Sequence, residues 1–249
     1  MLRSVSMDEI SDGKLYSSSD MVRADSLGCD GCHECCCHMG NSILLDPFDV
    51  YQMSKGLHVP ATALFNGRLQ LTPVDGIVLP AIAMTSDKDQ CSFLNEAGRC
   101  SIHMFRPGFC RLFPLGRVYD GTGFSYFLQT GQCKKERLAK VKVRQWINIP
   151  ELKRYEQFVC DWHYFLKDLA KTSQGLSPEL IKTLHSYILK VFYLTPYQDG
   201  SDFYDQFYMR LNDAKMGPSR AGYGWVARES APRASSGQIS LQAQKWHRA

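Results

Sequence analysis

The residues of this chain that could do chemistry are its cysteines, and half of them are crowded into one short stretch. Five of the ten cysteines lie within nine residues, in the sequence CDGCHECCC at 29–37. Cysteines that only fill a core behave as small buried hydrophobic residues, and these scatter along a chain. This stretch is polar and contains glycine, so a set of thiolate ligands explains it better. The spacing of Cys29, Cys32 and Cys35 is C-x2-C-x2-C, which matches the first three ligands of the bacterial ferredoxin run.

Further cysteines follow on predicted turns and hairpin ends. Cys91 and Cys100 flank a tight Glu-Ala-Gly turn, Cys110 follows an Arg-Pro-Gly segment, and Cys133 comes just after a glycine. A backbone that turns at these points can bring thiols together as a ligand pair. Cys160 differs, because it falls within a predicted amphipathic helix, and we expect it to be a packed thiol.

The order of these cysteines resembles that of the YkgJ family of CxxCxxCC cysteine-cluster proteins. The resemblance rests on Cys29-x2-Cys32-x2-Cys35-Cys36, on CSFLNEAGRCSIHMFRPGFCRLFP at 91–114, and on Gly131-Gln-Cys133, and it covers about residues 29–133. It implies a domain that chelates zinc or iron. The family includes FliB-type flagellin lysine N-methylases, which are associated with S-adenosylmethionine and an iron–sulfur centre. Cys37 is additional to the family pattern.

We expect the metal ligands among eight cysteines: Cys29, Cys32, Cys35, Cys36, Cys91, Cys100, Cys110 and Cys133. Eight thiolates exceed the four that one zinc ion or one [4Fe–4S] cluster needs, so either two centres are bound or part of the set has another role. Adjacent side chains diverge, which leaves open which of the consecutive cysteines are ligands. The triad spacing slightly favours an iron–sulfur cluster over zinc. A histidine could replace one thiolate, although each candidate is individually expected at the surface or behind a ligand (His33, His38, His103).

Two arginines flank Cys110. Arg106 and Arg111 are candidates to bind an anionic cofactor or substrate, or to compensate the negative charge of bound thiolates. The simpler alternative for each is a surface ion pair.

Several functions are compatible with such a site. The sequence favours a cysteine-cluster protein that carries a metal or cluster, senses it, or uses it as a structural module. The alternative that the resemblance implies is a protein lysine N-methyltransferase, which would require S-adenosylmethionine and a protein substrate. No catalytic residue is assigned. A glycine-rich nucleotide loop is also lacking, because Asp120-Gly-Thr-Gly123 is better interpreted as a hairpin turn.

Composition indicates the size of the core, the kinds of partner and the cellular compartment that we expect. The 249 residues are 44% hydrophobic, enough for one sizeable core, and 29 basic against 25 acidic residues leave a net charge of +4 that does not indicate nucleic-acid binding. No apolar run is long enough for a signal peptide or membrane helix, so we expect a cytoplasmic protein. In that compartment clustered cysteines are metal ligands or redox groups more often than a disulfide framework.

The elements that must position the cysteines predict an α+β fold. We expect a flexible leader at 1–20, a cysteine-rich metal-binding lobe of hairpins and short helices at 21–140, a helical C-terminal region at 141–215, and a disordered tail at 216–249. Helical character should begin near residue 137. We also expect few large apolar side chains near the cysteines, so that the metal would supply much of that lobe's stability. The individual predictions are helices from Pro47 to Lys55, from Pro60, and after Pro150, Ser177 and Ser201, and hairpins at 68–84 and 117–128.

Overall fold

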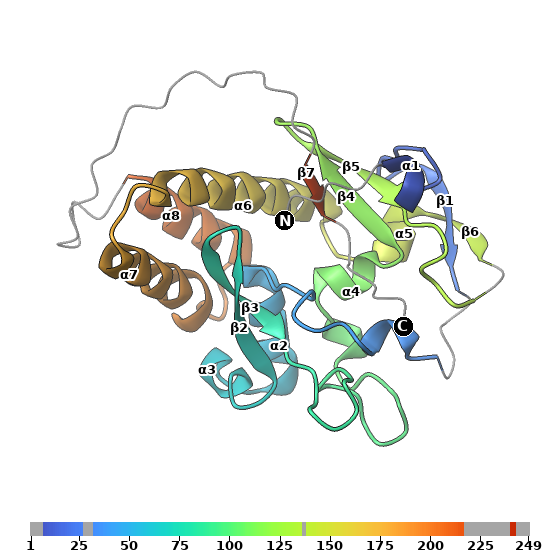
Figure 1. The fold of residues 1–249 in the computed structure, drawn as a ribbon, viewed down its shortest axis with the longest axis horizontal. Coiled ribbons are helices and arrows are strands. Elements are labelled where there is room, and N and C mark those ends of the chain that lie inside the picture. Colours follow the sequence, from blue (N-terminus) through green and yellow to red (C-terminus); the bar gives the residue numbers. More distant parts are fainter. Residues whose placement is uncertain (1–6, 27–31, 136–137, 217–239, 243–249) are drawn as a thin grey trace.

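The computed structural model describes residues 7–26, 32–135, 138–216 and 240–242, and it confirms the predicted α+β class. Short hairpins and helices make up the first part of the chain, and longer helices make up the second (Figure 1). No helix in these ranges is long and apolar enough to cross a membrane. In chain order the elements are α1 (Met7–Ile10), β1 (Met21–Asp25), η1 (Glu34–Cys36), α2 (Pro47–Leu57), α3 (Ala61–Leu64), β2 (Leu69–Val74), β3 (Ile77–Ile82), η2 (His103–Phe105), α4 (Gly108–Leu112), β4 (Leu115–Tyr119), β5 (Phe124–Leu128), β6 (Ala139–Lys142), α5 (Val143–Ile147), α6 (Leu152–Ser173), α7 (Pro178–Ile188), η3 (Leu189–Leu194), α8 (Phe203–Lys215) and β7 (Ser240–Gln242).

The strands form three small antiparallel sheets, β1–β6, β2–β3 and β5–β4–β7. Both predicted hairpins are confirmed. Between β2 and β3 the chain reverses at Asp75 and Gly76, whose φ angles are +49° and +85°. Between β4 and β5 the Asp120 carboxylate accepts hydrogen bonds from the backbone N–H groups of Thr122 and Gly123, at 2.9 and 2.7 Å. That segment is therefore a turn, as predicted, and not a nucleotide loop.

Two predicted boundaries were wrong. Helical structure does not begin near residue 137, because β6 first pairs with β1, with Val141 opposite Val22. A short segment whose side chains alternate between polar and apolar can pair with an open strand edge. It then forms a strand, whatever secondary structure follows it. The helix α2 also continues through Gly56 to Leu57 instead of stopping. A Cβ at residue 56 would lie 2.5 Å from the ring of Phe105, so this glycine allows close packing and does not end the helix.

The predicted leader and tail are only partly described. Within the leader, Ser11 and Tyr16 form bridges with Gln129 and Tyr126, beside β5. Within the tail, β7 pairs with β4. Residues 1–6, 217–239 and 243–249 lie outside the described residues.

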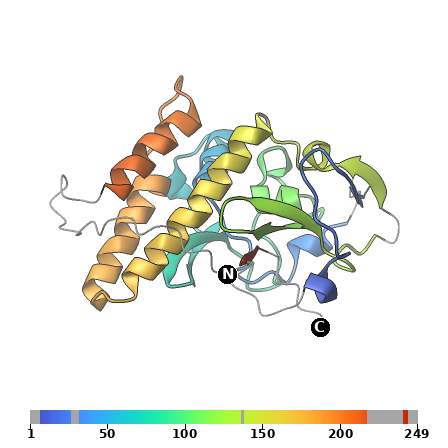
Figure 2. The same ribbon diagram turned by 90° about the horizontal axis from the view of Figure 1, so that it is seen from above.

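The helix α7 begins at the predicted cap Ser177, whereas α8 is capped by Asp202, one residue after the predicted Ser201. Ser177 accepts a hydrogen bond from the backbone N–H of Leu180 at the start of α7, and Asp202 accepts one from Asp205 at the start of α8. The helices α6, α7 and α8 lie side by side at one end of the molecule, away from the β1–β6 sheet (Figure 2).

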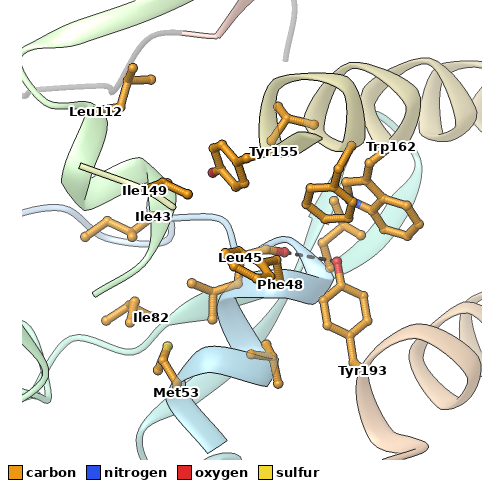
Figure 3. Packing of buried hydrophobic residues seen from close by; sticks show 14 of the residues in the cluster. Ile43, Leu45, Phe48, Met53, Ile82, Leu112, Ile149, Tyr155, Trp162 and Tyr193 are labelled. Carbon is orange, nitrogen blue, oxygen red and sulfur yellow. Dashed lines mark hydrogen bonds between the residues drawn. The ribbon is translucent and has the colours of Figure 1, made fainter. Parts of the chain in front are cut away.

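One hydrophobic core joins the cysteine-rich part to these helices. Phe48 of α2 lies 5.7 Å from Tyr155 and 5.0 Å from Phe203, measured between ring centroids. The Tyr193 hydroxyl donates to the carbonyl of Leu45 at 3.0 Å (Figure 3). The expectation of few large apolar side chains in the cysteine-rich part is therefore wrong. Because this part packs on α6, it buries large residues of its own, including Ile43, Leu45, Phe48, Met53, Leu64, Ile77, Ile82, Phe93, Ile102 and Leu112.

Candidate metal centre

Five of the predicted ligands come together from three distant segments. Cys35 and Cys36 lie on η1, Cys91 and Cys100 lie in the loop after β3, and Cys110 lies on α4. The Cys35 and Cys36 side chains share a hydrogen bond, and each of the other three thiols acts electrostatically on Cys35 or Cys36 or both. We call these five residues the thiol cluster.

Backbone hydrogen bonds align two of the segments. The backbone N–H of Cys36 donates to the His33 carbonyl at 2.8 Å, which forms the turn of η1. The N–H of Cys91 then donates to the Cys36 carbonyl at 2.7 Å, and Cys37 bridges Gln90. The 36–37 backbone is thus fixed alongside 90–91.

The loop that carries Cys91 turns back on itself to bring in Cys100. Leu94 forms an antiparallel bridge with Cys100, and the Asn95 side chain accepts the backbone N–H of Arg99 at 2.8 Å. The tight turn predicted between the two cysteines therefore exists, and it faces η1.

Cys110 reaches the cluster because α4 is docked tightly on its neighbours. The backbone N–H of Gly108 donates to the buried carboxylate of Asp49 at 2.7 Å. A Cβ at Gly108 would lie 1.9 Å from the Tyr155 hydroxyl oxygen, so only glycine allows this approach.

Burial keeps most of these thiols protonated in the absence of metal. It raises the pKa of Cys91 to about 11, and it also raises the pKa values of Cys100 and Cys110. Cys35 and Cys36 behave as a pair: their mutual hydrogen bond lowers the pKa of Cys35 and raises that of Cys36. Cys35 is therefore the first thiolate to form, and a bound cation would favour ionisation of the others.

The two arginines differ in what they contact. The charge of Arg106 lowers the pKa values of both Cys35 and Cys100. Arg111 is only 7% exposed, and its guanidinium donates to the backbone carbonyls of Met104, Arg106 and Asn148. Arg106 thus faces the thiols, whereas Arg111 also ties together the chain around α4.

The remaining cysteines are not among the five of the thiol cluster, and one of them is outside the described residues. Cys37 is half-buried beside Asp89, with Cys32 among the groups whose charge raises its pKa after burial. Cys133 lies in the loop after β5. Cys160 is buried on α6, as expected, with its sulfur 3.8 Å from the Thr122 carbonyl. Cys29 lies outside the described residues.

The thiol groups of the cluster suit a soft metal ion, although they do not form a complete coordination sphere. In the described part of the chain, no three His, Cys, Asp or Glu side chains stand close enough to hold one ion. Thiolates nevertheless select zinc or iron, and cysteine side chains can rotate about χ1. The backbone carbonyl of His33 accepts the N–H of Cys36. The side-chain Nδ1 atom of the same residue is buried without a hydrogen-bond partner. The residues present therefore fit a thiolate-bound metal by their chemistry.

Comparison with known proteins agrees with this donor set. Residues 28–142 match the model of the CxxCxxCC family, described as "Putative zinc- or iron-chelating domain". Searches of curated proteins and of solved structures give no significant match.

Proposed function

We propose that this chain, whose residues 28–142 match the CxxCxxCC family, binds one metal centre through its thiol cluster, as a metal or cluster carrier, a sensor or a structural module. The observation that carries this proposal is the convergence of five cysteines from three separate segments. Packing alone does not require so many thiols at one place.

The cluster favours one centre over two. A zinc ion or a [4Fe–4S] cluster takes four thiolates, and the thiol cluster supplies five. Because four thiolates complete either centre, we propose Cys91, Cys100 and Cys110 as ligands together with one of Cys35 and Cys36. The remaining predicted ligands, Cys29, Cys32 and Cys133, would serve a rearranged or second site.

The identity of the metal is tested by anaerobic purification followed by metal and sulfide analysis. Iron with acid-labile sulfide would support the [4Fe–4S] cluster that the triad spacing favours. Zinc without sulfide would support a mononuclear structural site. A protein that retains neither metal when supplied with both would contradict the proposal.

One observation favours the alternative, a methyltransferase that uses S-adenosylmethionine. A groove of about 490 Å³ lies beside the loop of the thiol cluster, within the size range of small-molecule sites. Aromatic and apolar side chains line most of it, together with Arg111 and with Lys55, which would exchange its 2.9 Å ion pair with Asp199 for an anionic group such as a carboxylate. Calorimetric titration with S-adenosylmethionine separates the two functions. Saturable binding that is weakened by Lys55→Gln would support the enzyme, and no heat of binding would leave the metal carrier or module.

A further inference from the structure

We propose that the imidazole of His33 is a ligand of the metal centre, bound through Nδ1. The inference rests on the proposed metal site and replaces one of its four thiolates, that of Cys35 or Cys36, by a nitrogen donor, which leaves Cys91, Cys100 and Cys110 as the sulfur ligands. The first observation is that the His33 Nδ1 atom is buried. Among the described residues, no group donates a hydrogen bond to it or accepts one from it. A buried polar atom in that position is costly unless something absent from the protein atoms satisfies it.

The ring lies against the turn that connects Cys91 to Cys100. His33 is the residue whose carbonyl accepts the N–H of Cys36 at the start of η1. Its ring packs against Gly98, in the turn between Cys91 and Cys100: a Cβ at residue 98 would lie 2.9 Å from Nδ1 and 3.1 Å from Cε1. Gly98 thus leaves room for this imidazole beside the turn that delivers two of the proposed ligands.

The other histidines near these segments have different surroundings. The Nδ1 of His38 is exposed and 3.0 Å from the Asp89 carboxylate. The Nδ1 of His103 is 3.3 Å from the guanidinium of Arg106, whose positive charge disfavours a second cation. The described residues of this region therefore offer His33 as the histidine with an available buried nitrogen.

Charge balance supports a mixed donor set. Four thiolates around a divalent ion leave two negative charges in a largely buried site, where Arg106 supplies one positive charge. Three thiolates and a neutral imidazole leave one negative charge, which Arg106 would balance. Burial of net charge is unfavourable, so this set is the better match to its surroundings.

The test uses the full-length protein loaded with zinc and examined by X-ray absorption. We expect three sulfur neighbours at about 2.3 Å and one imidazole nitrogen at about 2.0 Å. In His33→Gln the imidazole contribution should disappear, and zinc affinity, measured by chelator competition, should fall at least about tenfold. The matched control, His38→Gln, should change neither.

The outcomes separate this inference from the function on which it rests. A wild-type spectrum with four sulfurs and no nitrogen would overturn the assignment of His33 and leave the metal site intact. An imidazole contribution that persists in His33→Gln would also overturn it. Wild-type protein that binds neither zinc nor iron would overturn the metal site and His33 together. If His33→Gln does not fold, long-range ¹H–¹⁵N spectra of wild-type imidazoles with and without zinc decide, because zinc must shift the His33 Nδ1 resonance.

Discussion

At Cys110, burial favours the protonated thiol, so a metal that binds there must displace a proton. The surrounding protein raises the pKa of this thiol well above its ordinary value, first by burial and then by the neighbouring Cys91. Without a cation, the protein therefore holds a group of mostly neutral thiols. A bound metal would expel their protons, and its binding should be accompanied by proton release.

Removal of single thiols tests which of them bind the metal. We expect Cys91→Ser, Cys100→Ser and Cys110→Ser each to lower metal affinity at least about tenfold, because serine cannot replace a soft thiolate. Cys160→Ser, on α6 and outside the cluster, is the control and should retain full metal. Metal per chain after dialysis against a weak chelator measures the effect. Full retention in both Cys91→Ser and Cys110→Ser would show that the cluster is not the site.

A second titration should be visible in folding stability. Burial raises the pKa of Asp49 to about 6, against about 3.9 for an exposed aspartate. The folded state thus favours the protonated form, and the stability that this form contributes is complete below about pH 3.9 and is lost as the pH rises through about 6.

Asp49→Asn should reduce this pH dependence, and the part that comes from the neighbouring buried carboxyl of Asp46 should remain. Between pH 4 and 7 the wild-type denaturation midpoint should fall relative to that of the variant, while Asp168→Asn, at an exposed site on α6, should follow the wild type. The asparagine lowers stability at every pH by about 1–3 kcal/mol, because its amide cannot accept both backbone N–H groups that Asp49 accepts. The readout is therefore the slope, and parallel wild-type and variant curves would contradict the assignment.

Among the elements, α4 has the tightest packing constraint and carries a proposed ligand. Its first residue, Gly108, lies against the hydroxyl of Tyr155 on α6. Gly108→Ala should therefore destabilise the protein by about 1–3 kcal/mol through overpacking, and the shift of α4 should weaken metal binding through Cys110.

Tyr155→Phe offers a specific rescue of Gly108→Ala, because it removes the oxygen that the new methyl group would meet. We expect the double variant to recover both stability, measured by denaturant unfolding, and metal affinity, beyond the sum of the single changes. Additive effects would mean that the two residues are not in contact. Gly123→Ala, where a Cβ meets nothing within 4 Å, is the matched control.

These elements also show what could be read from the sequence. Turn and capping signals are local, so Asp75-Gly76, Asp120-Gly121 and Ser177-Pro178 were sufficient to predict two hairpins and the start of α7. The strand β6 was missed because its pairing with β1 joins residues more than a hundred positions apart. Gly56 was misread as a helix end for the same reason, since its close contact with Phe105 exists only in the folded chain.

In the site, too, local features could be predicted from the sequence and contacts between distant segments could not. Spacing correctly suggested that Cys91 and Cys100 meet across a turn. It gave no means of separating Cys110, which joins the cluster through the docking of α4, from Cys133, which lies in the loop after β5. The environment of His33 was equally hidden, because Gly98 was interpreted from the sequence only as part of a tight turn, and its contact with the His33 ring exists only in the folded chain.

At the scale of the whole molecule, the continuous core changes what metal removal should do. The cysteine-rich part packs Phe48 and other large side chains on α6 and α8, and each buried side chain of this size contributes about 1.5–3 kcal/mol. The proposed metal is therefore not required to hold the fold together. It would hold η1, the loop after β3 and α4 against one another, where the described residues are joined by a few backbone hydrogen bonds.

We therefore expect chelation to loosen one region and leave the rest intact. In hydrogen exchange, amides of residues 32–37 and 91–112 should exchange at least about tenfold faster after metal removal, since their opening no longer breaks metal–thiolate bonds. Amides of α2 and α6, buried in the shared core, should keep their protection. The control is Cys110→Ser without chelator, which should reproduce the local pattern. Loss of protection throughout α6 on chelation would mean that the metal stabilises the whole fold, and unchanged exchange in 91–112 would mean that it does not bind at the thiol cluster.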